Sequence, residues 1–189
     1  MATPWIKRIK DTGQLSVFNK ATAWSDAVHA AITAFNQLSL GVKLVAAKDE
    51  KSANIVLVLA SGHQQYTYGG DTTTTDSDFK PDRLHGETDA FQDDRLKVIF
   101  FAVIFLPGKV KGTKNQREVI VVHEFIHACG VEEHESVGIM FAQMKESDGG
   151  LIEYLPDAGA KAMPPIRVGP QTLCKVRMLW AGGGACKKN

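Results

Sequence analysis

A His-Glu-x-x-His motif lies at His123, Glu124 and His127 of the 189-residue chain. Residues four apart on a helix lie on the same face, so these two imidazoles can bind one metal ion between them. The glutamate lies close enough to act as a general base on a water molecule at that ion. The surrounding helix is apolar, and burying these polar groups would be costly without a partner. The motif therefore predicts a Zn²⁺ site.

The residues after the motif are suited to complete that site. Gly130 is expected to end the helix, because glycine readily takes the left-handed conformation found at helix ends. The chain can then fold back and bring a third ligand to the metal. His134 follows four residues after this glycine, and Met140 six residues after that histidine.

The sequence HEFIHACGVEEH, followed by Gly138-Ile139-Met140, resembles the zinc-binding consensus and Met-turn of the metzincin metalloproteases, within them the matrixin-like branch. The family has two residues between the glycine and the third histidine, whereas this chain has three. The position of the family's third ligand therefore falls on Glu133 in this chain. Either the loop bulges by one residue and His134 binds, or Glu133 binds as a carboxylate. Imidazole suits zinc and the family uses it, which favours His134.

The resemblance implies a zinc-dependent endopeptidase that acts on protein or peptide substrates. One catalytic Zn²⁺ would be bound by the three histidines, and Glu124 would accept the proton of the attacking water. Met140 would lie under the metal as an apolar base. The order of the elements before and after the motif also resembles the matrixin-like layout.

The substrate-binding side of the site is less defined. The region equivalent to residues 61–95 contains the upper rim of the cleft in the family, and residues 83–91 are expected to form that edge strand. An open edge can pair with an extended substrate. Leu84, Gly86 and Phe141 are candidate substrate-binding residues. The histidines and aspartates of residues 61–95 are also candidates for a structural Zn²⁺ or Ca²⁺.

Three alternatives stay open. A gluzincin-type protease would take its third ligand from a glutamate on a later helix, such as Glu146 or Glu153. A non-proteolytic zinc hydrolase would act on another amide, such as a cell-wall link. An inactive protein would keep the metal site for a structural or binding role.

The apolar pattern predicts an α+β fold with an N-terminal amphipathic helix and a short C-terminal helix. The resemblance implies that its sheet is a metzincin-like twisted mixed sheet and that the central helix binds zinc. Thr22 is the expected N-cap of the first helix, and Thr113 with Gln116 predicts a capping box on the second. The chain is expected to be one domain, residues 1–189, with a flexible tail from about residue 182. The elements are expected at residues 5–18 (one or two strands), 24–38 (helix), 41–47, 53–60 and 97–106 (strands), 115–129 (helix) and 169–180 (helix); the segment after Met140 is expected to be irregular.

Composition narrows the partners. The net charge of +1 gives no case for nucleic-acid or membrane binding, and we expect a monomer. The N-terminus has no apolar signal-peptide core, so the compartment stays unknown: cytoplasmic by default, or reached by a non-classical export route. Cys129, Cys174 and Cys186 do not indicate a disulfide framework. We expect reduced thiols, with Cys174 and Cys186 as the two that could pair.

Overall fold

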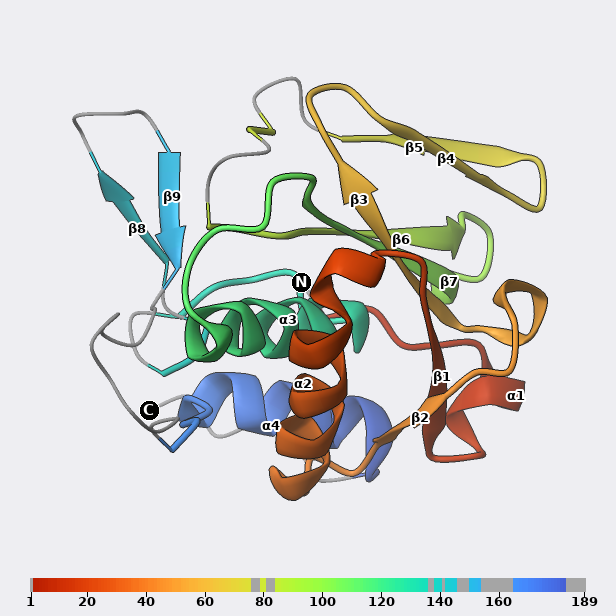
Figure 1. The fold of residues 1–189 in the computed structure, drawn as a ribbon. Coiled ribbons are helices and arrows are strands. Elements are labelled where there is room, and N and C mark those ends of the chain that lie inside the picture. Colours follow the sequence, from red (N-terminus) through yellow and green to blue (C-terminus); the bar gives the residue numbers. More distant parts are fainter. Residues whose placement is uncertain are drawn as a thin grey trace.

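The computed structural model describes residues 2–75, 79–80, 84–135, 138–140, 142–145, 150–153 and 165–182. Its centre is a five-stranded sheet with three helices on one face and a β-hairpin on the other (Figure 1). The strands in spatial order are β2 (Lys43–Ala46), β1 (Gln14–Asn19), β3 (Ile55–Ala60), β7 (Val98–Pro107) and β6 (Glu87–Asp93). The first four are parallel and β6 is antiparallel to β7. The predicted mixed α+β class is confirmed at this level.

Strand β7 separates two apolar cores. Its residues alternate between the faces of the sheet, as the two-residue period of a strand requires. Ala102, Ile104 and Leu106 belong to the core under the helices. Phe101 and Val103 belong to a second core, under the hairpin of β4 (Gln65–Tyr68) and β5 (Asp71–Thr74). The sheet is therefore covered on both faces, which explains the continuous apolar sequence of β7.

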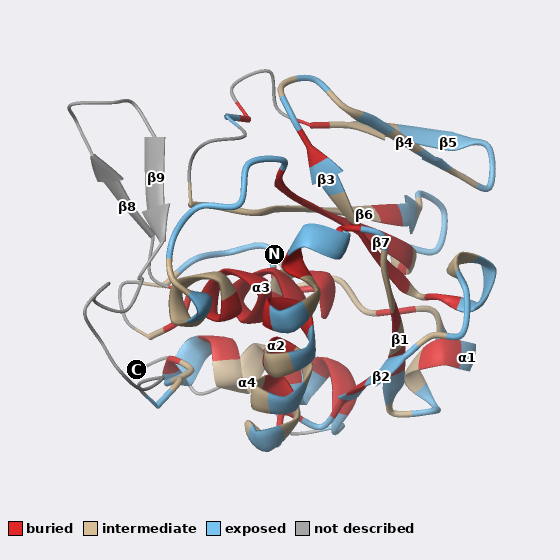
Figure 2. Ribbon diagram, viewed as in Figure 1, coloured by how far each residue is buried: buried red, intermediate tan, exposed pale blue. Residues whose placement is uncertain are grey.

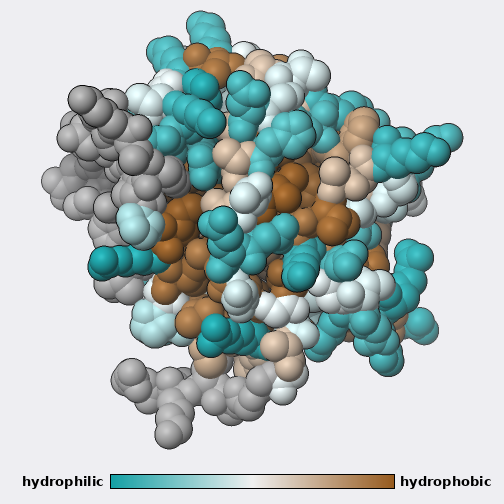
Figure 3. All heavy atoms as spheres, turned by 60° about the horizontal axis from the view of Figure 1, so that its bottom comes forward, coloured by the Kyte–Doolittle hydropathy of each residue, from teal (hydrophilic) through white to brown (hydrophobic). Residues whose placement is uncertain are grey.

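The helices α2 (Ser25–Gln37), α3 (Lys114–Ala128) and α4 (Pro170–Trp180) form the other layer. Phe35 of α2 meets Phe125 of α3 edge to face, with ring centroids 6.1 Å apart. Viewed from this side, polar residues surround a central apolar area of the surface (Figure 3). The three predicted helices are confirmed. Thr22 is not the N-cap of α2, because a 3₁₀ turn (Thr22–Trp24) precedes that helix.

Several short elements differ from the sequence-based expectation. The chain forms a one-turn helix α1 (Lys7–Lys10) where a strand was expected, and Trp5 forms a single β-bridge with Ile99 of β7. Residues 61–95, expected to be irregular apart from the rim, contain the β4–β5 hairpin as well as the edge strand β6. A second hairpin, β8 (Ala142–Lys145) with β9 (Gly150–Glu153), lies in the segment after Met140 that was also expected to be irregular. A further 3₁₀ turn, η2 (Glu50–Ser52), precedes β3.

Cys174 on α4 is disulfide-bonded, so the expectation of reduced thiols is wrong at this position. The suggested partner, Cys186, lies outside the described residues, as does the expected tail beyond Gly182. Cys129 is free and fully buried, as predicted for a small core residue. Within the described parts of the chain, none of the helices is long and apolar enough to cross a membrane.

Candidate metal centre

Helix α3 carries the motif through the middle of the molecule. Its start is fixed by the predicted capping box: Thr113 Oγ1 accepts from Gln116 N at 3.2 Å, and Gln116 Oε1 accepts from Thr113 N at 3.0 Å. Most of its length is buried (Figure 2). His123 and Glu124 are each 1% exposed. Polar groups buried this completely need partners, and the surrounding residues supply them.

Gly130 ends the helical segment as predicted, with φ at +102°. The last carbonyls before it accept from side chains rather than from the helix. Trp5 Nε1 donates to Ala128 O at 2.8 Å, and Trp180 Nε1 donates to Cys129 O at 3.1 Å. Thr3 N donates to Gly130 O at 2.8 Å. The N-terminal segment and α4 therefore both fix the point at which the chain turns back.

The structure brings His123, His127 and His134 together. The Nε2 atoms of His123 and His127 are 3.0 Å apart, and they lie 3.1 and 3.3 Å from Nε2 of His134. Within the described part of the chain, these three histidines are the potential ligand side chains that lie close enough together to hold a metal ion. His123 is buried, His127 half-buried and His134 exposed.

The outer ring nitrogens determine the tautomers. His123 Nδ1 lies 2.8 Å from Ile139 O, and His127 Nδ1 lies 2.7 Å from Val131 O. A carbonyl can only accept, so each Nδ1 carries a proton and each Nε2 of the neutral ring presents a lone pair. Burial lowers the pKa of His127 to about 4, so this ring is neutral near neutral pH. Burial also lowers the pKa of His123.

The converging nitrogens fit a bound cation. The Nε2 atoms of His123 and His127 are 3.0 Å apart, and their lone pairs repel each other unless a positive charge lies between them. Tetrahedral zinc with nitrogen ligands at about 2.0–2.1 Å places those ligands about 3.3–3.4 Å apart, close to the observed separations. Backbone carbonyls orient ligand histidines in this way in metal sites. The residues therefore suit a first-row transition metal.

Glu124 lies under β6, the edge strand. Thr88 Oγ1 is 2.5 Å from Glu124 Oε2 and 3.2 Å from its backbone oxygen. The hydroxyl donates to the carboxylate, since an ionised carboxylate only accepts. A Cβ on Gly86 would lie 2.5 Å from Glu124 Cγ and 2.8 Å from Oε1. Glycine at this position therefore makes room for the carboxylate under the strand.

Glu133, the alternative third ligand, faces away from the histidines. Its carboxylate pairs with Lys175 Nζ on α4. This ion pair is the main cause of a pKa of about 2 for Glu133. The one-residue insertion is thus absorbed by turning this side chain outward, and His134 takes the place beside the helix histidines.

The Met-turn segment contacts the motif directly. Ile139 supplies the carbonyl that orients His123, and its own N donates to Arg167 O at 2.7 Å. Gly138 takes φ +74°. Met140 is fully buried in the core under the helices, and its carbonyl accepts from Glu135 N at 3.0 Å. Residues 138–140 therefore lie against the segment that carries His134.

The structure says less about the role of the other residues predicted for the site. Leu84 lies against Gly112, where an added Cβ would come within 2.6 Å of its Cδ2. Gly86 contacts the Glu124 side chain rather than open space. Phe141 and Glu146 lie outside the described residues. Glu153 lies in strand β9, whereas the gluzincin alternative requires its ligand on a helix.

The sequence did not point to four of the residues that shape this centre. Thr88 lies 36 positions before the glutamate it contacts, and Lys175 lies 42 positions after its partner. In the sequence, Trp5 and Trp180 look like ordinary core residues. No spacing in the sequence links any of them to the motif, so the structure was needed to find them.

No family model matches the chain, and a search of the curated proteins finds no match either. The relation to metzincins therefore remains a resemblance, which depends on the motif, the glycine turn and the methionine that follows. The histidine cluster itself does not depend on it, because the geometry alone places three imidazoles at metal-binding distance.

Proposed function

We propose that this chain is a zinc-dependent endopeptidase of metzincin-like design. The observation that carries the proposal is the convergence of three imidazole nitrogens, two of them from α3, the helix that also carries the buried Glu124. A purely structural site needs no general base, and it usually has four protein ligands. The described residues offer three ligands, which leaves a position for water or substrate.

Zinc is the metal that this donor set favours, because imidazole suits it and three-histidine sites are typical of catalytic zinc. When bound, the ion would supply Lewis-acid chemistry, polarising the scissile carbonyl and acidifying a water molecule. His123, His127 and His134 would hold it through Nε2. The Nδ1–H bonds to Ile139 O and Val131 O keep the first two rings neutral and oriented.

Glu124 would move the proton. Its carboxylate takes a proton from the attacking water and returns it to the nitrogen of the leaving amine. The Thr88 hydroxyl holds one of its oxygens, Oε2, at 2.5 Å. Because the side chain is almost fully buried, water competes little for it. This preorganisation is what a general base needs in order to act at one defined position.

Edge strand β6 supports a peptide as substrate. It lies at the edge of the sheet and contacts Glu124 through Thr88, and Gly86, just before the strand, lies against the same side chain. A sheet edge can add an extended peptide as a further strand. Such a peptide would pass beside the proposed base, which favours a polypeptide over a compact amide substrate.

The test compares three proteins: the wild type, Glu124→Gln, and Glu118→Gln as a control. Glu118 is also a buried glutamate of α3, six residues before Glu124. We expect one equivalent of zinc in all three by metal analysis. Peptide-library cleavage should be lost by at least about a hundredfold in Glu124→Gln and kept in Glu118→Gln.

Other outcomes separate the alternatives. Cleavage of cell-wall amides without cleavage of any library peptide would replace the endopeptidase by another zinc amidase. Zinc binding with no hydrolysis of either would indicate a non-catalytic metal protein. Full activity in Glu124→Gln would refute the proposed mechanism.

A further inference from the structure

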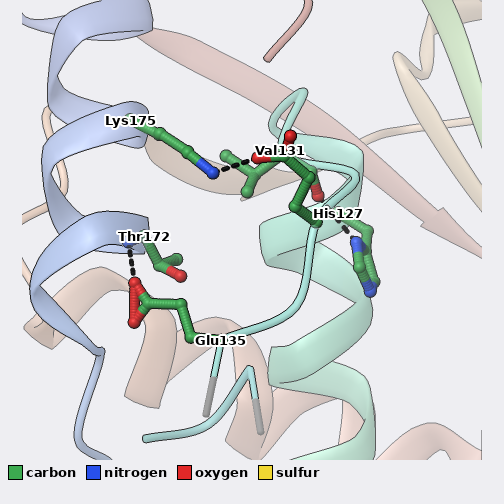
Figure 4. Close-up of polar contacts among 6 residues, drawn as sticks. His127, Val131, Glu135, Thr172 and Lys175 are labelled. Atoms are coloured by element: carbon green, nitrogen blue, oxygen red, sulfur yellow. Dashed lines mark hydrogen bonds and ion pairs between the residues drawn. The ribbon is translucent and has the colours of Figure 1, made fainter. Parts of the chain in front are cut away.

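We propose that helix α4 positions His134 by binding the residue on each side of it. This inference deepens the proposed metal site and rests on it. Glu133 pairs with Lys175 Nζ, and the Glu135 carboxylate accepts from Thr172 N at the start of α4 (Figure 4). Neither Lys175 nor Thr172 belongs to the histidine cluster. Both are therefore positioning residues rather than ligands.

The third histidine needs such support more than the other two. His123 and His127 belong to one rigid helix, and each ring is held by a backbone carbonyl. His134 lies in a non-helical segment after Gly130 and is exposed. Ordering a residue of this kind costs backbone conformational entropy. Contacts that order the segment before metal arrives remove that cost from the binding step.

The two acidic neighbours suit this purpose because their side chains lie on the other side of the segment from the His134 ring. Glu133 and Glu135 both contact α4, while His134 between them faces the helix histidines. Glu135 also donates its backbone N–H to Met140 O. The segment is thus held from α4 and from the Met-turn together.

The ion pair also keeps Glu133 from acting as a ligand. A carboxylate next to the third histidine is itself a good zinc ligand. Lys175 neutralises this carboxylate and holds it on the side of α4. Lys175 therefore selects imidazole over carboxylate.

Helix α4 is a firm support for these contacts. Val176 is fully buried, and Trp180 donates to Cys129 O at the end of α3. Cys174, next to Lys175, is disulfide-bonded. Glu135 accepts at the N-terminal end of the helix, where unpaired N–H groups and the helix dipole favour a negative charge. Its carboxylate thus stabilises the helix that holds it.

The experiment measures zinc affinity by competition with a chromophoric chelator, on the full-length protein. Lys175→Met removes the cation and keeps the side-chain length, and Lys175→Arg restores the cation. Glu135→Met removes the acceptor, and Glu135→Gln restores one. Lys20→Met is the matched control, because it breaks another lysine–glutamate pair, with Glu50 at 2.9 Å, away from the histidines. Thermal unfolding of each metal-free protein tests whether the fold is intact.

We expect Lys175→Met to bind zinc about twofold to fivefold more weakly than the wild type, the range of a partly exposed ion pair. Glu135→Met should lose about tenfold, because it removes a hydrogen bond to a charged acceptor. Lys175→Arg, Glu135→Gln and Lys20→Met should bind like the wild type. In Co²⁺-loaded Lys175→Met, the visible spectrum should change as Glu133 competes with His134 for the metal.

Failure of this inference is distinguishable from failure of the metal site through His134→Ala. Wild-type affinity and an unchanged cobalt spectrum in both Met variants, with weak binding in His134→Ala, would overturn the positioning role alone. Wild-type zinc affinity in His134→Ala would show that His134 is not a ligand, and this would overturn the inference as well. Equal losses of zinc affinity in Lys175→Met and Lys20→Met would show that the effect comes from the change in net charge. This outcome would also overturn the inference.

Discussion

Trp5 and Trp180 donate their indole N–H groups to consecutive carbonyls, Ala128 O and Cys129 O, at the end of α3. Their rings lie against each other, with centroids 6.5 Å apart. One indole comes from the N-terminal segment and the other from α4. Both ends of the described chain therefore satisfy the backbone groups that a helix leaves unpaired at its C-terminus.

The first prediction concerns Trp180→Phe, which keeps an aromatic ring and removes the donor to Cys129 O. We expect a loss of about 2 kcal/mol in the free energy of unfolding, because the buried carbonyl loses its partner and the ring becomes smaller. The melting temperature should fall by about 4–8 °C. Met178→Ala is the control on the same helix, since this side chain is 38% exposed; an equal loss there would contradict the prediction.

The second prediction concerns Gly130→Ala. The glycine has φ at +102°, and an added Cβ would lie 2.0 Å from Thr3 O. We expect a loss of more than about 3 kcal/mol by denaturant unfolding, because the N-terminal segment would have to leave its place. Gly13→Ala has φ at +63° with no atom within 4 Å of the added Cβ, and should cost only about 1 kcal/mol. Similar losses of stability in both variants would show that backbone strain alone determines the loss, and this would contradict the prediction.

The third prediction concerns Thr88→Val, a substitution of similar shape without the hydroxyl. Glu124 Oε2 would lose the donor 2.5 Å away, so the proposed general base would be less well oriented. We expect kcat/KM for peptide cleavage to fall roughly tenfold to a hundredfold, with zinc content unchanged. Thr88→Ser keeps the hydroxyl and should retain most of the activity. A loss of zinc in Thr88→Val would instead indicate a structural role.

The fourth prediction follows from Glu118, whose pKa burial raises above the ordinary value of 4.5. A carboxyl group with a raised pKa in the folded state costs stability once it ionises. That cost begins as the pH rises past 4.5 and is complete above the raised pKa. Glu118→Gln should therefore be more stable than the wild type at neutral pH, and the gain should vanish below pH 4.5 in denaturant unfolding. A gain that is constant with pH would contradict this account.

The fifth prediction concerns metal removal. Dialysis against a chelator should lower the melting temperature, and added Zn²⁺ should restore it in proportion to the logarithm of its concentration, because a ligand that binds the folded state stabilises it. His123→Ala should show no such response. A zinc response that survives in His123→Ala would mean that the ion acts elsewhere on the molecule.

The long elements could be predicted from the sequence because local signals specify them. Helix α3 has its capping box, and β7 has a continuous apolar run that is typical of a strand covered on both faces. The short elements could not. Helix α1 follows Ile6, whose N donates to Ile99 O on β7, so a contact between distant segments sets it. In the β4–β5 hairpin, only β4 alternates, through Tyr66 and Tyr68, and it is four residues long; β5 has no apolar residue to reveal it.

The same division holds at the metal centre. The spacing of the motif predicts His123 and His127, because both belong to one helix face. His134 needed the resemblance to choose it over Glu133, and the reason for that choice, Lys175, lies on a helix far along the chain. Sequence patterns report contacts within one element, whereas these contacts join separate elements.

The position of α4 in the chain also sets an order of assembly during synthesis. Helix α3 emerges with His123 and His127 already one turn apart, while residues 170–180 are still to be made. A nascent chain at that stage carries the two helix histidines and a third-ligand segment that lacks its contacts with α4. Helix α4 then completes the support of His134. A polypeptide interrupted before that helix would carry the whole motif without the finished centre.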